Sequence, residues 1–275
     1  MKEAALELVR EIPDPSGKLN LLREYVQAMV LRSLHESEAF VSLAFVGGTA
    51  LRFIHSLPRF SEDLDFSLYG SSGYTPEKWM KKVKMDLELE GFDARVSWSD
   101  KTTVHKSWIK VSGILKEAGL AAMPDQNMSI KLEIDSRPPA GATTETGIVN
   151  RHALLSMRYY DLSSLMAGKI HALMTRGYPK GRDWYDLVWY MAKRPPVQPN
   201  LVQLQNALDQ TQGSGIFAAS CWKSLLAERI RTLDCADLAE DVGSFLERPE
   251  ERALLTEANI LSVLKGLAEP LVVPA

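Results

Sequence analysis

The sequence predicts an α+β protein, with a mixed α/β domain in residues 1–160 and a helical domain in residues 161–275. Two stretches predict strands, because apolar and polar residues alternate through Asp63–Leu68 and Ser129–Ser136 as they do in half-buried strands. From Ser163 onward the apolar residues recur at helical spacing, and glycines or prolines separate the segments. We therefore expect a mixed twisted sheet flanked by helices, followed by a helical C-terminal part.

Composition excludes several classes of protein. Of the 275 residues, 45% are hydrophobic and 24% charged, which is typical of a folded globular protein. The formal net charge of −3 argues against a globally basic nucleic-acid-binding protein but allows a local basic patch. Cys221 and Cys235 lack metal-ligand spacing, no apolar run approaches the ~20 residues of a membrane span, and the N-terminus does not resemble a signal peptide. These features predict a cytoplasmic protein with reduced thiols.

The first domain begins with two helices and then contains all the predicted strands. Leu43–Val46 is a short apolar strand that breaks at Gly47-Gly48-Thr49, after which Ala50–Leu57 continues as a helix. Thr75 followed by Pro76 marks another helix start, and Gly91 marks its end. The remaining expected elements are helices 3–10 and 16–37 and strands 92–98, 107–114 and 148–157.

The second domain is predicted to be helical throughout. Gly177 to Gly181 separates its first two helices, and Pro195-Pro196 ends the second. The expected helices are 165–176, 182–192, 200–211, 219–231, 235–247 and 250–267.

The first candidate functional feature is Gly47-Gly48-Thr49 at the strand-to-helix turn. Glycines there let the backbone approach a phosphate closely, and the following helix presents free N–H groups and the positive end of its dipole. By itself a Gly-Gly pair before a helix is more often a plain tight turn. The motif becomes informative only together with the acidic residues that follow it.

The second feature is a set of strand-borne acids. Asp63 and Asp65 point the same way from one predicted strand, with backbones roughly 6–7 Å apart. Glu133 on another strand supplies a third acid, and Asp135 on the same face is the alternative. Crowded carboxylates favour a bound cation, and Mg²⁺ suits a few carboxylates with water and triphosphate oxygens. Two such ions could activate a hydroxyl and stabilise a pyrophosphate leaving group. An Asp-x-Asp pair alone is more often a solvated strand face.

The third feature is a group of charged residues in the helical domain. Lys169 and Arg176 fall on nearly one helix face and could hold a triphosphate. Asp183 and Asp186 lie three apart on a helix that is otherwise apolar, so they need partners, which Lys169 or Arg176 would supply. The alternatives are a surface lysine at Lys169, and interhelical salt bridges as the role of Arg182 and Asp183.

These features belong to five segments: Gly47 to Arg52, Arg59 to Phe66, Lys131 to Ile134, Lys169 to Leu173, and Arg182 to Leu187. Taken together, and in this order over roughly residues 40–190, they resemble the AbiEii/AbiGii toxin nucleotidyltransferase family. That family belongs to the DNA polymerase β-like nucleotidyltransferases. Each motif is weak alone, and the combination is specific.

The resemblance implies a minimal nucleotidyltransferase fold and an NTP-dependent enzyme whose active site draws on both domains. The implied nucleotide-binding residues are Gly47, Gly48, Thr49, Arg52, Arg176 and Arg182. The implied metal ligands are Asp63, Asp65 and Glu133, and the implied catalytic residues are Asp63, Asp65, Lys169, Asp183 and Asp186.

The resemblance also implies a biological role. Members include the toxin halves of bacterial toxin–antitoxin and phage abortive-infection systems, and several are thought to add nucleotides to tRNA acceptor ends and so block translation. We therefore expect Mg²⁺ as cofactor, NTP as substrate, an RNA, namely tRNA, as acceptor, and a cognate antitoxin as partner.

Two other functions stay open from the sequence. The same fold could transfer a nucleotide to an antibiotic hydroxyl or a protein side chain, since fold does not settle the substrate. A nucleotide- or partner-binding protein without transfer is the other, although a pure binder has little need of two strand-borne carboxylates. Cations for RNA phosphates are available at Lys78, Lys81, Lys82 and Lys84 on one helix and at Lys101, Lys106 and Lys110, although a lysine-rich helix is more often a solvated face.

Overall fold

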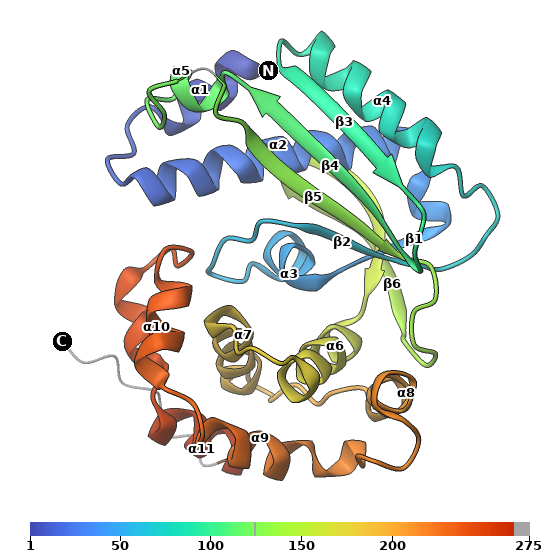
Figure 1. Ribbon diagram of the computed structural model, residues 1–275, viewed down its shortest axis with the longest axis vertical. Helices are drawn as coiled ribbons and strands as arrows, with labels where there is room; N and C mark the ends of the chain where they lie inside the picture. Colours follow the sequence, from blue (N-terminus) through green and yellow to red (C-terminus); the bar gives the residue numbers. More distant parts are fainter. Residues whose placement is uncertain (124, 267–275) are drawn as a thin grey trace. The chain divides into compact units, whose positions relative to one another are not determined.

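The computed structural model describes residues 1–123 and 125–266, which form two compact units (Figure 1). Unit 1 comprises Met1–Ser56, Phe60–Pro138 and Thr144–Tyr159. Unit 2 comprises Leu57–Arg59, Pro139–Thr143 and the chain from Tyr160 onward. In the described part of the chain, no helix is long and apolar enough to cross a membrane.

Unit 1 is built on a seven-stranded sheet of order β3-β4-β5-β2-β1-β7-β6. The strands are β1 (Leu43–Val46), β2 (Leu64–Leu68), β3 (Asp93–Ser99), β4 (Val104–Ser112), β5 (Met128–Asp135), β6 (Thr144–Arg151) and β7 (Ala153–Tyr160). The sheet is mixed, because β2 pairs with β5 and β1 with β7 in parallel, whereas β1–β2, β3–β4 and β4–β5 are antiparallel. With the helical C-terminal part, this confirms the predicted α+β class.

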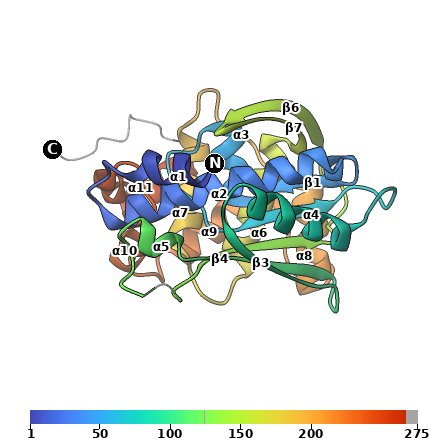
Figure 2. The ribbon, with the colours of Figure 1, turned by 90° about the horizontal axis from the view of Figure 1, so that it is seen from above.

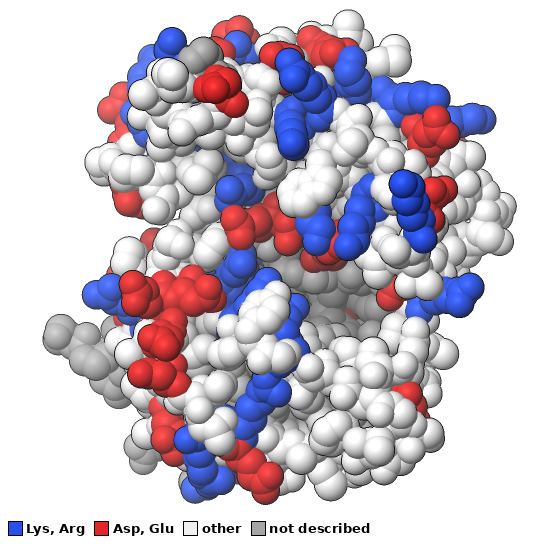
Figure 3. Space-filling model, in the orientation of Figure 1, with Lys and Arg blue, Asp and Glu red and all other residues white. Residues whose placement is uncertain are grey.

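The sheet has one apolar face and one polar face. In β5, Ile130, Leu132 and Ile134 are buried, and the residues between them are half-buried on the other side. Helices α2 (Pro15–Glu36) and α4 (Pro76–Leu89) contact each other and pack against β5 and β3 respectively, behind the sheet in the view of Figure 1, as Figure 2 shows. The opposite face, seen in Figure 3, carries charges of both signs.

The helices of unit 1 begin and end within a few residues of the predicted positions. The predicted helices include α1 (Lys2–Val9) and α3 (Gly47–His55). Two short elements were not predicted, the helix α5 (Ile114–Glu117) and the 3-10 turn η1 (Ala39–Val41). The predicted single strand 148–157 is wrong, because β6 and β7 are two strands that meet at His152, a residue with φ 58°. Val149 is the only buried residue described in β6, and no turn-forming glycine marks the break, so the sequence pattern lacked a signal for two strands.

A buried carboxylate links several elements of unit 1. Glu24 on α2 accepts hydrogen bonds from Arg52 on α3, from Arg151 at 3.1 Å and from the His152 ring at 3.0 Å. Burial alone would raise the pKa of Glu24, but His152, Arg52 and Arg151 lower it from 4.5 to about 2. Arg52 also lies 4.1 Å over the Phe60 ring and is buried, which favours a structural role for its guanidinium.

We expect Glu24→Gln to lower the free energy of unfolding at pH 7 by about 2–4 kcal/mol, because the change leaves buried cations without a charged partner. The folded-state pKa of Glu24 is depressed, so its contribution is fully present above pH 4.5 and is lost as the pH falls towards 2. Urea unfolding at pH 7 and pH 3 measures this. Glu88→Gln, which removes an exposed i,i+4 pair with Lys84, is the control and should cost under about 1 kcal/mol. Equal losses for both variants would contradict the assignment.

Unit 2 is helical. Its helices are α6 (Leu162–Thr175), α7 (Gly181–Ala192), α8 (Leu201–Gln212), α9 (Trp222–Ile230), α10 (Cys235–Gly243) and α11 (Glu257–Lys265), with 3-10 turns η2 (Ala219–Cys221) and η3 (Pro249–Leu254). The predicted helix 250–267 is therefore two pieces. The reason is Thr256, whose side chain caps a new helix by accepting a hydrogen bond from the Asn259 N–H at 3.2 Å.

Helix α7 begins in close contact with α10. A Cβ added to Gly181 would lie 1.9 Å from the Leu238 carbonyl oxygen, and the Gly181 N–H donates to the Asp241 carboxylate at 2.7 Å. Only glycine allows this approach, so Gly181 fixes where α7 starts and thereby where Asp183 and Asp186 lie on it.

Candidate active site

The acidic residues of unit 1 meet on the polar face of the sheet. The parallel register of β2 and β5 pairs Asp65 with Glu133, so the two side chains leave neighbouring strands on the same face. Asp63 lies just before β2 begins at Leu64. Asp135, the alternative third acid, pairs with Ser67, and its carboxylate accepts the Arg137 N–H at 2.9 Å. Between these two acids, the register favours Glu133 as the neighbour of Asp65.

Lys131 lies among these acids. Its ammonium is 2.8 Å from Glu133, and that carboxylate also has Lys106 at 3.7 Å. Burial alone would lower the pKa of Lys131, but Glu133, Asp63 and Asp65 raise it. The four groups thus form one electrostatic cluster. Our sequence analysis did not assign Lys131 a site role, although its position two residues before Glu133 on the same strand already predicts a shared face.

The glycine turn is in contact with this cluster. Gly47 opens α3 with φ 79°, and a Cβ added to it would lie 2.4 Å from a carboxylate oxygen of Asp65. The glycine is required here both by the backbone conformation and by the space that Asp65 fills. Val46 provides no side-chain cap and the first turn of α3 contains no acid, so the helix start offers backbone N–H groups to an anion.

Two buried side chains hold the residues before β2. Gln27 on α2 donates to the carbonyls of Ser61 at 3.1 Å and Glu62 at 2.9 Å, and the Thr49 hydroxyl donates to the carbonyl of Asp63. Three consecutive carbonyls are therefore anchored. This use of its hydroxyl makes Thr49 a residue that positions Asp63, and any phosphate contact at the turn falls to backbone N–H groups.

The donor set fits Mg²⁺ in one particular way. Asp63 and Asp65 provide hard carboxylate oxygens, and Mg²⁺ is usually held by one or two carboxylates with water and phosphate oxygens completing the octahedron. Across residues 1–123 and 125–266, no three His, Cys, Asp or Glu side chains form a closed metal-binding group. Glu133 instead forms ion pairs with Lys131 and Lys106. The residues thus suit an ion shared with a bound nucleotide rather than a cage made by protein alone.

The charged residues predicted in the helical part form a second cluster, within unit 2. Lys169 on α6 lies 2.8 Å from both Asp183 and Asp186 on α7, and Arg176 pairs with Asp183. This confirms the predicted partners of the two acids. Burial alone would lower the pKa of Lys169, but Asp183 and Asp186 raise it, so Lys169 is a fixed cation at neutral pH. Burial alone would raise the pKa of Asp183, but Lys169, Arg176 and Arg59 lower it.

Comparison with known proteins identifies the family. A family model described as nucleotidyl transferase AbiEii toxin, Type IV TA system, matches residues 30–257. The chain belongs to this family. It is therefore a nucleotidyltransferase toxin of a type IV toxin–antitoxin system, with an NTP as substrate and a cognate antitoxin as partner. This confirms the resemblance and the class of enzyme predicted from the sequence.

Two solved structures share the fold of this AbiEii family member. JHP933 from Helicobacter pylori has 19% sequence identity and a TM-score of 0.54, covering 90% of this chain and 93% of that chain. A candidate nucleotidyltransferase from H. pylori has 20% identity and a TM-score of 0.54, covering 91% and 98% of the two chains. A search of curated proteins gives no match.

One member of the AbiEii charge cluster had no assigned role in our sequence analysis. Arg59 is buried, and its guanidinium makes two hydrogen bonds of 2.6 Å to the carboxylate of Asp186. The two residues are 127 apart in the chain, so spacing carries no signal for the pair. One feature of the sequence could have indicated that Arg59 is buried. It lies between Leu57 and Phe60, and an arginine among apolar neighbours is less expected on the surface.

Arg182, the remaining predicted arginine, lies on α7 beside an aromatic ring. Its guanidinium is 4.1 Å above the Phe245 ring. The predicted nucleotide-binding residues thus have three kinds of surroundings. Gly47 and Gly48 lie at the start of α3, Arg176 belongs to the charge cluster, and Arg52 and Arg182 lie against aromatic rings.

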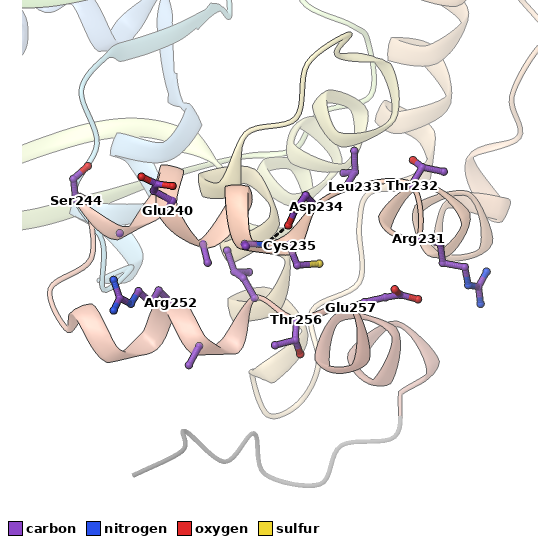
Figure 4. Close-up of a pocket in the computed structure, with 15 residues that line it drawn as sticks. Arg231, Thr232, Leu233, Asp234, Cys235, Glu240, Ser244, Arg252, Thr256 and Glu257 are labelled. Atoms are coloured by element: carbon purple, nitrogen blue, oxygen red, sulfur yellow. Dashed lines mark hydrogen bonds between the residues drawn. The ribbon is translucent and has the colours of Figure 1, made fainter.

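A hollow in unit 2 lies between α10, η3 and the start of α11 (Figure 4). Cys235, Glu240, Arg252 and Glu257 are among its lining residues. None of the residues predicted for the nucleotide-transfer site lines it. The hollow is therefore lined by residues other than those of the unit 2 charge cluster.

Proposed function

We propose that the protein transfers a nucleoside monophosphate from an NTP, with Mg²⁺, to the 3′ end of a tRNA, and so blocks translation. In this reaction the 3′ hydroxyl oxygen forms a bond to the α-phosphorus. The bond from that phosphorus to the bridging oxygen breaks, and pyrophosphate leaves. The hydroxyl proton passes to water or to a carboxylate of the site.

The contact between Gly47 and Asp65 carries this proposal. It joins the start of α3, which suits an anionic phosphate, to a carboxylate that suits a metal ion. A triphosphate bound at this helix start would lie beside Asp65. Asp63 and Asp65 would hold Mg²⁺, which when bound offsets the negative charge of the phosphates and the leaving group.

Unit 2 supports the proposal through Lys169. The ion pairs to Asp183 and Asp186 hold its ammonium in place, and its raised pKa keeps it charged. A fixed cation of this kind suits a phosphate that gains negative charge during transfer. We propose Lys169 as a catalytic residue, with Asp183 and Asp186 orienting it.

The test is incorporation of label into RNA. The purified protein is incubated with each radiolabelled NTP, Mg²⁺ and total cellular RNA, alongside Asp63→Ala and Lys169→Ala. We expect wild type to label RNA of tRNA size with at least one NTP, and both variants to lose the label by at least about 100-fold. Wild-type labelling no greater than that of the variants, with all four NTPs, would defeat the proposal. Label in protein or in a small molecule would instead support a different acceptor.

A further inference from the structure

Residues paired across neighbouring strands form rows on the polar face of the sheet. The row that contains Asp65 extends onto β5 and β4. Along β5 and its neighbours, Glu133 pairs with Asp65 on one side and Lys106 on the other. The next row on the same face pairs Trp108 with Lys131 and Ser97, and the one after pairs Lys110 with Ser129 and Arg95. Successive rows on one face of a strand are about 6–7 Å apart. The acids and this surface therefore form one continuous face.

Trp108 is the unusual residue of this face. Its side chain is 44% exposed, whereas Ile109, its neighbour on the opposite face, is buried beneath the helices. β4 lies next to the edge strand β3, and an exposed aromatic ring on this polar face is available to stack against a ligand. Its partner in register, Lys131, contacts Glu133, so the ring lies one row from the acids.

The lysines and arginines of unit 1 differ in whether they form ion pairs, and those on the sheet differ in this from those on α4. On α4, Lys81, Lys82 and Lys84 each form an ion pair with a nearby acid, so that helix is largely neutralised. Arg95 and Lys110 are exposed on the sheet face, and neither has an ion-pair partner among the residues that the structure describes. Figure 3 shows Lys and Arg side chains gathered over β3, β4 and β5. Arg95 and Lys110 thus place unpaired positive charge beside the aromatic ring, while on α4 Lys78 is exposed as well.

We propose that this face, defined by Trp108 with Arg95, Lys106 and Lys110, binds the unpaired 3′ segment of the RNA acceptor. This inference rests on the proposed function. A base stacks on Trp108, and the phosphates lie against the cations, which directs the terminal hydroxyl along the face towards Asp65. The occupant is a single strand, because its unpaired and unstacked bases expose the faces on which an aromatic ring stacks. Charge complementarity favours a polyanion over a neutral or basic partner.

Direct binding tests the inference without NTP. A short fluorescently labelled single-stranded RNA is titrated with wild type, Trp108→Ala, Trp108→Phe, and the charge reversal Arg95→Glu with Lys110→Glu, and anisotropy is measured at several salt concentrations. We expect roughly tenfold weaker binding for Trp108→Ala, most of the affinity retained by Trp108→Phe, and a smaller salt dependence for the charge reversal. The controls are Tyr69→Ala, an exposed aromatic residue outside β3–β5, and Lys81→Glu on α4; both should bind as wild type.

Kinetics separate this inference from the proposed function. In the transfer assay, Trp108→Ala should raise KM for RNA roughly tenfold, with KM for NTP unchanged. RNA binding unaffected by Trp108→Ala and by the charge reversal would overturn the inference, even if wild type labels RNA. Loss of antitoxin binding with unchanged RNA affinity would also overturn it. Conversely, weakened RNA binding in these variants would support the surface even if wild type transferred nucleotides to another acceptor.

Discussion

Replacing Gly47 with alanine is expected to reduce nucleotide transfer by about 100-fold or more, because the new methyl group would occupy the space of the Asp65 carboxylate. The added Cβ would lie 2.4 Å from an oxygen of Asp65, which is closer than real Cβ atoms come, and 3.0 Å from its Cβ, which is at the tight limit of real contacts. Either Asp65 or the start of α3 must move, and misplacement of a reacting group by about 1 Å can cost 100-fold in rate. The φ of 79° adds backbone strain to alanine.

The measurement is the initial rate of label incorporation at saturating NTP, together with the midpoint of thermal unfolding. Gly70→Ala is the matched control, since Gly70 is in the same unit, has no atom within 4 Å of an added Cβ and has an ordinary φ. It should retain activity. In the background of Asp65→Ala, the stability cost of Gly47→Ala should shrink, because the clashing carboxylate is gone. Wild-type activity in Gly47→Ala would show that Asp65 does not need its present position.

Local pattern is the basis for the candidate site residues that lie close together in the chain. Alternation along one strand places Asp63 with Asp65, and the same rule applied to β5 would have placed Lys131 with Glu133. The change from period two to helical period near residue 160 likewise predicted where the strands end. Such predictions are open to sequence reasoning because they depend on residues only a few positions apart.

Other parts depend on pairs that are distant in the chain. The register that pairs Asp65 with Glu133 is set by the packing of whole strands, and no spacing rule predicts it. The pair of Arg52 with Glu24 has the same difficulty, because its partners lie 28 residues apart in the chain. The hairpin at His152 was missed for a local reason, since β6 is largely exposed and its turn contains neither glycine nor proline.

The ion-pair cluster of unit 2 gives the largest expected effect on stability. Asp186 is fully buried and binds Arg59 through two 2.6 Å hydrogen bonds and Lys169 at 2.8 Å. Asparagine keeps the shape of the side chain but removes the negative charge that offsets these two cations. We expect Asp186→Asn to lower the free energy of unfolding of unit 2 by about 3–5 kcal/mol, the usual cost of breaking a buried pair from one side.

Thermal unfolding followed by circular dichroism measures this loss, and Asp237→Asn on α10 is the control. Asp237 is exposed, so its change should stay within about 0.5 kcal/mol. We also expect the loss of stability to differ between substitutions of Asp186 and of its partner Arg59. Arg59→Met replaces a buried cation with an apolar side chain and leaves Asp186 paired with Lys169, so it should cost less than Asp186→Asn, which leaves both cations without their shared carboxylate. An equal or larger loss for Arg59→Met would mean that the bidentate arginine, rather than the shared carboxylate, is the main source of stability in the cluster.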